Sequence, residues 1–150
     1  MNSELHKLLK SCDVLGAWEF PPGANWDQSI DEIRSLKMEV DRVLGVPTRL
    51  DDQVQDASFF ADLGVLKQLP SPDKTLVLSY DFCLRFSWFS RLFTVFGDRW
   101  TEYDVSRIFE VLDKNGFVYV PSSELDELYD GINEPFETGL TWWTRYFDYL

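Results

Sequence analysis

The last ten residues of the chain hold five large aromatic side chains, Trp142, Trp143, Tyr146, Phe147 and Tyr149. Chain ends fray unless they are tied into a sheet or a core. Covering one such ring stabilises a protein by roughly 1.5–3 kcal/mol. The sequence therefore predicts a docked segment, which we interpret as the last strand of a sheet. In a strand, Trp142 and Trp143 point to opposite faces, so one would enter the core and the other would face a helix layer or a partner.

Apolar spacing predicts the other elements. The clearest helix spans residues 27–44, where Ile30, Ile33, Leu36 and Val40 repeat at helical spacing before Gly45 and Pro47. Residues 75–96 are rich in β-branched and aromatic residues and alternate in polarity, which favours two strands joined by a turn. Two shorter helices are expected over residues 3–10 and 57–64, although a strand is possible in the second segment.

These elements predict one α+β domain over residues 1–150, because helices and strands are segregated along the chain. The sheet is expected to be mainly antiparallel and packed by helices. The strands are expected near residues 15–20, 75–88, 91–96, 117–120 and 141–149, and the helices near 27–44 and 101–114.

Charge excludes two classes of partner. Against 14 Lys and Arg stand 26 Asp and Glu, a formal net charge of −12. Nucleic acids and anionic membranes both demand a basic surface, so neither is expected as a partner. The N-terminal residues lack a secretory pattern, and no stretch approaches the roughly 20 apolar residues needed to span a bilayer. We therefore expect a cytoplasmic protein, whose oligomeric state the sequence leaves open.

Common catalytic and cofactor patterns are missing from the sequence. It has one histidine, His6, and two cysteines, Cys12 and Cys83, far apart along the chain. This set supports no Ser-His-Asp triad, no ordinary zinc site and no disulfide framework. Glycine-rich phosphate loops and the nucleophile-elbow motif are absent as well. No catalytic residue, cofactor or metal is therefore predicted.

One segment resembles a calcium-binding EF-hand loop. Asp113, Asn115 and Glu124 match its first, third and twelfth positions. Phe117 at the fifth position has no side-chain oxygen, and Val118 stands where the loop needs glycine. A helix, an Asn-Gly turn and a strand explain the same residues without a metal.

In size, acidity and lack of catalytic motifs, the chain resembles bacterial toxin-immunity proteins. That resemblance implies a non-enzymatic inhibitor, or adaptor, for a basic protein partner, steered by charge. Carboxylates are dense in residues 51–62 and 124–137, which become the expected contact zones. The candidate contact residues are Asp51, Asp52, Asp56, Asp62, Glu124, Asp126, Glu127, Asp130 and Trp143.

The alternative is a small-ligand-binding protein, or a carboxylate-based enzyme, with an aromatic-lined pocket on the sheet. Asp81 and Arg85 fall on one face of the 75–88 strand, where they would form a structural ion pair or part of such a site. The candidate pocket residues are Asp81, Arg85, Trp88, Trp142, Arg145 and Tyr146.

Overall fold

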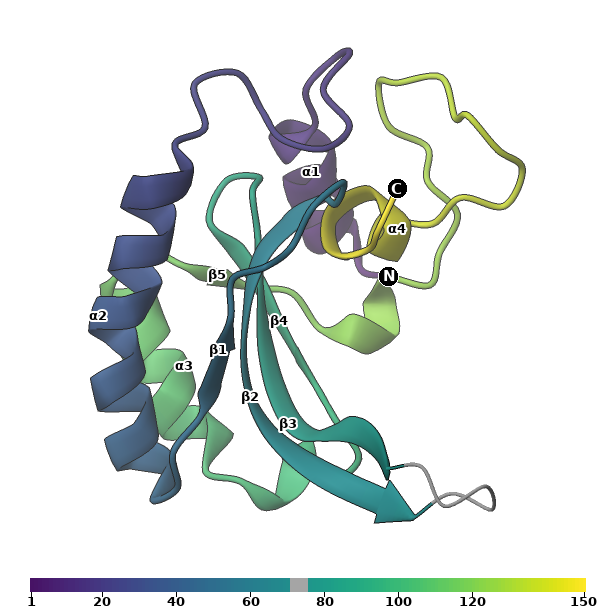
Figure 1. The fold of residues 1–150 in the computed structure, drawn as a ribbon. Helices are drawn as coiled ribbons and strands as arrows, with labels where there is room; N and C mark the ends of the chain where they lie inside the picture. Colours follow the sequence, from purple (N-terminus) through teal and green to yellow (C-terminus); the bar gives the residue numbers. More distant parts are fainter. Residues whose placement is uncertain (71–75) are drawn as a thin grey trace.

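The computed structural model describes residues 1–70 and 76–150 and shows an α+β fold built on a five-stranded sheet (Figure 1). Strands lie in the order β1-β2-β3-β4-β5, antiparallel except for the parallel pair β4 and β5. The strands are β1 (Arg49–Asp51), β2 (Phe59–Pro70), β3 (Leu76–Ser87), β4 (Leu92–Phe96) and β5 (Val118–Tyr119). The helices are α1 (Ser3–Cys12), α2 (Trp26–Leu44), α3 (Val105–Lys114) and α4 (Trp142–Phe147), with 3-10 turns at Trp100–Glu102 and Ser122–Glu124.

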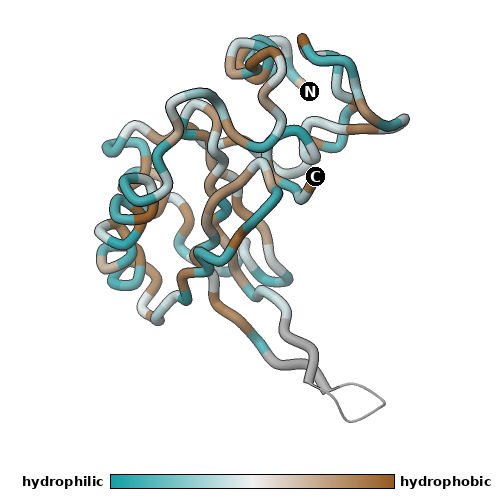
Figure 2. Tube along the Cα trace, turned by 45° about the horizontal axis from the view of Figure 1, so that its top comes forward, coloured by the Kyte–Doolittle hydropathy of each residue, from teal (hydrophilic) through white to brown (hydrophobic). Residues whose placement is uncertain are grey.

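Helices α2 and α3 cover one face of the sheet (Figure 1). Asn25 caps the start of α2 by accepting a hydrogen bond from the Gln28 amide, and Gly45 ends the helix in the left-handed conformation. Hydrophilic and hydrophobic residues alternate along these helices in Figure 2, as expected when one face meets the sheet. Most buried side chains of this core come from α2, α3 and strands β2 to β4, and they include Ile33, Val40, Phe82, Phe86, Phe93 and Leu112.

A second core joins α1 and α4 to the turn between β3 and β4. Leu9, Phe89, Trp142, Tyr146 and Phe147 are all buried in it. The rings of Trp142 and Tyr146 stack with centroids 5.7 Å apart. The prediction that the aromatic C-terminal segment is docked is thus confirmed.

Its predicted conformation was wrong, because residues 142–147 form helix α4 instead of a strand over 141–149. Thr141 caps the helix by accepting a hydrogen bond from the Thr144 amide. A helix places Trp142 and Tyr146, four residues apart, on the same face, and both are buried there. Within the part of the chain that the structure describes, the strand pairing of this segment is limited to two isolated β-bridges, one between Thr141 and Leu128 and one between Tyr149 and Ala57.

The predicted strand over 15–20 is absent, since this segment is a loop of turns with Gly16 at a positive φ of 76°. Residues 57–64, for which a helix was predicted with a strand as the alternative, belong mostly to β2, where the ladder with β3 pairs Leu63 with Leu84 and overrides local preference. The expected helix over 101–114 begins only at Val105, because Tyr103 is extended.

The helix over 27–44 and the strands near 91–96 and 117–120 are confirmed by α2, β4 and β5. The strand expected over 75–88 is β3, although residue 75 lies outside the described residues.

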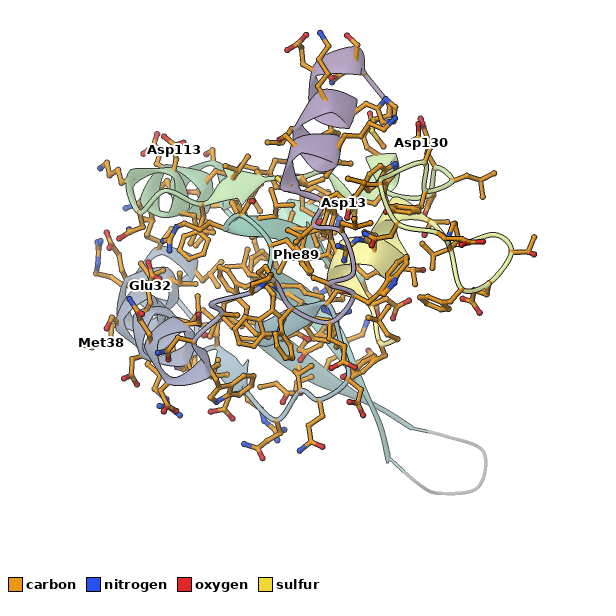
Figure 3. The ribbon with its side chains drawn as sticks, turned by 90° about the horizontal axis from the view of Figure 1, so that it is seen from above. Asp13, Glu32, Met38, Phe89, Asp113 and Asp130 are labelled. Atoms are coloured by element: carbon orange, nitrogen blue, oxygen red, sulfur yellow. The ribbon has the colours of Figure 1, made fainter. Side chains whose placement is uncertain are left out.

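A fully buried arginine ties α4 to the N-terminal part of the chain. The Arg145 and Asp13 side chains are 0% and 1% exposed, and the Arg145 Nε donates to Asp13 Oδ1 over 2.8 Å. The same guanidinium donates to the Ala17 carbonyl over 2.7 Å and to the Trp18 carbonyl over 3.2 Å. Its Cζ lies 4.3 Å from the ring centroid of Phe89 (Figure 3 labels Asp13 and Phe89). The charge is therefore paired, and each of its three nitrogens makes a hydrogen bond, as burial demands.

We predict that Arg145→Met lowers the free energy of unfolding by about 3–5 kcal/mol, because it leaves the Asp13 carboxylate buried without its cation. The double variant Asp13→Asn with Arg145→Met, which removes both charges, should lose less than the single variant. Urea unfolding of the three proteins measures both quantities. A double variant at least as destabilised as Arg145→Met would contradict this view of the pair.

Candidate functional site

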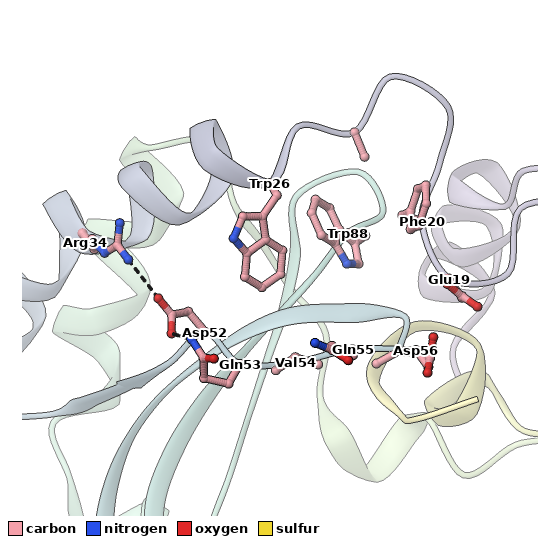
Figure 4. Close-up of a pocket in the computed structure, with 12 residues that line it drawn as sticks. Glu19, Phe20, Trp26, Arg34, Asp52, Gln53, Val54, Gln55, Asp56 and Trp88 are labelled. Atoms are coloured by element: carbon pink, nitrogen blue, oxygen red, sulfur yellow. Dashed lines mark hydrogen bonds and ion pairs between the residues drawn. The ribbon is translucent and has the colours of Figure 1, made fainter.

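An open pocket of about 760 Å³ lies where the start of α2, the end of β3 and two loops meet (Figure 4). One loop leads into α2, and the other joins β1 to β2. The lining residues are Glu19, Phe20, Ala24, Trp26, Arg34, Asp52, Gln53, Val54, Gln55, Asp56, Ala57 and Trp88.

Three aromatic rings form one wall of the pocket. The Trp26 and Trp88 ring centroids are 5.7 Å apart, and those of Phe20 and Trp88 are 6.1 Å apart. Behind them, Phe60 from β2 packs against Trp88 at 5.0 Å, so the pocket wall continues into the main core. Phe20 itself is 54% exposed. The wall therefore offers aromatic surface that the protein does not cover with its own side chains.

An ion pair lies at one end of the pocket. Arg34 of α2 donates from Nη2 to Asp52 Oδ2 over 2.9 Å (Figure 4). The Gln53 side chain donates to the other Asp52 oxygen, also over 2.9 Å. The hydrogen bond from Gln53, aided by Arg34, holds the pKa of Asp52 below its ordinary value against the opposing effect of burial. Asp52 thus remains a carboxylate at neutral pH.

Two further carboxylates, Glu19 and Asp56, lie toward the other end of the pocket (Figure 4). Both residues are exposed, and neither makes an ion pair within residues 1–70 and 76–150. Asp56 has a positive φ of 50°, a conformation that Asp tolerates better than most residues. With Arg34 as the one cationic lining residue, the pocket holds three carboxylates against one guanidinium. Its potential is therefore negative, which favours a cationic ligand.

Hydrogen bonds from α4 and the residues after it hold two segments that line the pocket, the one with Glu19 and Phe20 and the one with Asp56 and Ala57. The Trp18 carbonyl, next to Glu19 and Phe20, accepts from Arg145 and from the Ser58 hydroxyl, each over 3.2 Å. The Ser58 amide donates to the Asp148 carbonyl over 3.1 Å, and the Leu150 amide donates to the Asp56 carbonyl over 3.0 Å. Trp88, from the aromatic wall, joins the same network, since its amide donates to the Ser58 carbonyl.

The six predicted pocket residues do not converge on one site. Trp88 lines the pocket, whereas Trp142, Arg145 and Tyr146 are buried in the second core. Asp81 and Arg85 each form a structural ion pair, but with different partners. Arg85 pairs with Asp62 over 2.9 Å and donates to the Phe147 carbonyl.

Some of the predicted contact residues are free at the surface, and others already pair with groups of the same chain. Asp52 and Asp56 line the pocket, and Asp51 precedes them at the end of β1. The structure removes Asp62 from the contact surface, because its carboxylate is buried against Arg85. The remaining residues lie elsewhere: Glu124 and Glu127 contact the Met1 amine, Asp130 pairs with His6 and Lys10, Asp126 is exposed, and half-buried Trp143 packs on Phe96.

Sequence reasoning missed Glu19, Phe20, Trp26 and Arg34 as site residues. Trp26 was detectable, since it precedes Ile30 by four residues and so continues the apolar face of α2. Phe20, next to Pro21 in a loop, gave no periodic signal.

The segment that resembles a calcium-binding loop contains β5, paired in parallel with β4, and the 3-10 turn at Ser122–Glu124. Across the described residues, no group of three or more His, Cys, Asp and Glu side chains is placed to hold a metal ion. Likewise, none of the described helices has the length and apolar character needed to cross a membrane. No protein-family model, curated protein or solved structure matches the chain.

Asp81 generates a prediction about acid stability. Arg99 donates to it over 2.8 and 2.9 Å and the Tyr103 hydroxyl over 2.6 Å, which lowers the pKa of Asp81 to about 2. Because this pKa is below that of the unfolded chain, roughly 3.9, the stabilisation is complete above the unfolded value and is lost as pH falls through the folded one. We expect Asp81→Asn to lower the melting temperature at pH 7, and the difference from wild type to shrink between about pH 4 and pH 2. A difference that stays constant over this range in thermal unfolding would contradict the assignment.

Proposed function

We propose that this protein is a non-enzymatic binding protein, an immunity-type inhibitor or adaptor, that captures a basic protein partner through the acidic aromatic pocket. The observation that carries the proposal is the pocket itself, in which Phe20, Trp26 and Trp88 stand beside three carboxylates. Aromatic residues that other side chains can pack against are enriched at the centres of protein interfaces. The net charge of −12 would speed the approach of a basic partner.

The lining of the pocket suits the binding of a cation better than it suits acid-base catalysis. A general acid at neutral pH needs a carboxyl whose pKa is raised, whereas the pKa of Asp52 is lowered. The other two lining carboxylates, Glu19 and Asp56, belong to exposed residues that a charged group of a partner can reach. The three groups are therefore suited to hold a positive charge.

A second region extends the proposed contact surface. Leu128, Ile132 and Phe136 are exposed on the loop that precedes α4, among the carboxylates of Asp126 and Asp130. Exposed apolar side chains surrounded by charge are typical of protein contacts. The loop lies next to the segment that carries Glu19 and Phe20, because Phe136 packs on the preceding residue, Trp18, with ring centroids 4.9 Å apart.

The proposal includes a cytoplasmic location and no binding to nucleic acid. Cys12 and Cys83 are both free and buried, which fits a reducing compartment. The excess of carboxylates would repel phosphate backbones.

The alternative is a carrier of a small cationic ligand in the same pocket. The specific observation in its favour is the volume of about 760 Å³. This value lies within the range of roughly 300–1,000 Å³ that is typical of small-molecule sites.

A salt-dependent capture experiment tests the proposal. Immobilised wild-type protein is incubated with source lysate at low and high salt, and the retained proteins are identified by mass spectrometry. We expect a basic protein that is retained at low salt and lost at high salt, because screening weakens exposed charge interactions. With that partner purified, Glu19→Gln with Asp56→Asn should weaken binding about tenfold.

The matched control is Glu110→Gln with Asp113→Asn, which removes two exposed charges from α3, outside the pocket lining. It should change the affinity by less than about twofold, since its charges do not meet the partner. If both double variants weaken binding equally, the pocket is not the contact site. Retention that is indifferent to salt, or retention of acidic proteins alone, would contradict the proposal.

A further inference from the structure

Among the described residues, three arginines each pack on an aromatic face and pair with a carboxylate. Arg85 Cζ lies 3.9 Å from the ring centroid of Phe59 and pairs with Asp62. The Arg145 Cζ lies 4.3 Å from the ring centroid of Phe89, and its guanidinium pairs with Asp13. The third arginine is Arg91, whose Cζ lies 4.1 Å from the ring centroid of Phe117 and whose guanidinium pairs with Glu32. The protein thus uses one recurring arrangement to hold a guanidinium: a ring below it and a carboxylate at its edge.

The pocket presents the same two elements without an arginine over its rings. Its wall of Phe20, Trp26 and Trp88 faces solvent-accessible space, and Glu19 and Asp56 lie beside it (Figure 4). Among the described residues, no arginine or lysine lies over any of these three rings. Arg34, the one cationic lining residue, is turned to Asp52 (Figure 4).

We propose that the pocket receives an arginine side chain of the basic partner, with its guanidinium over the wall of Phe20, Trp26 and Trp88 and its N–H groups donating to Glu19 and Asp56. The inference rests on the proposed function and names the group that the site recognises. A partner arginine fits the charge of the pocket, whose three carboxylates are matched by one internal guanidinium.

Arginine suits this site better than lysine. Its planar guanidinium stacks on an indole face while its edge still donates several hydrogen bonds. It also loses less hydration than a compact ammonium group when it contacts aromatic surface. The internal precedents point the same way, because every cation found over a ring in the described structure belongs to an arginine.

The test is a titration of the full chain with three small probes: the acetylated methylamides of arginine, lysine and citrulline. Citrulline has nearly the shape of arginine but no charge. Binding is followed by NMR through the indole N–H signals of Trp26 and Trp88. We expect saturable shifts of both signals with the arginine probe at concentrations on the order of millimolar. The lysine and citrulline probes should bind at least about fivefold more weakly.

Matched variants locate the binding. Phe20→Ala should weaken the arginine probe about threefold or more, whereas Met38→Ala should leave its affinity unchanged. Met38 is 80% exposed on α2 and lies outside the pocket lining, so the pair controls for the loss of an exposed apolar side chain. Asp56→Asn retains a residue that tolerates positive φ and removes the charge, and it should also weaken binding. Equal affinity for the arginine and citrulline probes, no saturable shift, or unchanged binding by Phe20→Ala and Asp56→Asn would overturn the inference.

The inference and the proposed function can fail separately. If wild type and Phe20→Ala capture the same basic protein with equal affinity, the proposed function stands and the arginine site is overturned. If wild type captures no basic protein but the arginine probe binds as predicted, the proposed function fails and the pocket retains its specificity for a guanidinium.

Discussion

The buried guanidinium of Arg145 connects segments that are distant along the chain. It pairs with Asp13 after α1 and donates to the carbonyls of Ala17 and Trp18. Asp13 in turn accepts from the Ile132 amide and the Asn133 side chain, so the loop before α4 joins the same network. A fully buried arginine is stable only with such complete pairing. The cluster therefore fixes where the chain runs between α1 and α2, a stretch without regular secondary structure.

This constraint gives the pocket its shape. The backbone carbonyl of Trp18 directly precedes Glu19 and Phe20, and hydrogen bonds from Arg145 and the Ser58 hydroxyl hold it. Arg85 secures the other end of α4 by donating to the Phe147 carbonyl. Loops generally lose much entropy when they order around a ligand. A loop already held by the buried Arg145 avoids that cost, which suits the proposed role of the pocket as a preformed receptor for a cationic side chain.

Sequence patterns predicted the parts of the fold that local periodicity determines. The spacing of Ile30, Ile33, Leu36 and Val40 identified α2, because an amphipathic helix repeats its apolar face. The aromatic C-terminal segment was correctly expected to be buried, but its helix depends on a tertiary context in which Trp142 and Tyr146 face one core. The pocket was harder to foresee. Phe20, Trp26, Asp52 and Trp88 come from four separate segments, and only the folded chain brings them together.

Amide hydrogen exchange on wild type and Arg145→Met tests most directly whether Arg145 holds the pocket walls. Removal of the guanidinium should speed exchange at the amides of residues 17–20 and 56–58, because these segments lose their link to α4. The amides of α2 and of the central strands β2 and β3 should exchange at nearly wild-type rates under conditions where global unfolding is rare. Unchanged exchange at 17–20 and 56–58, or a uniform increase over the whole chain, would contradict this role of Arg145.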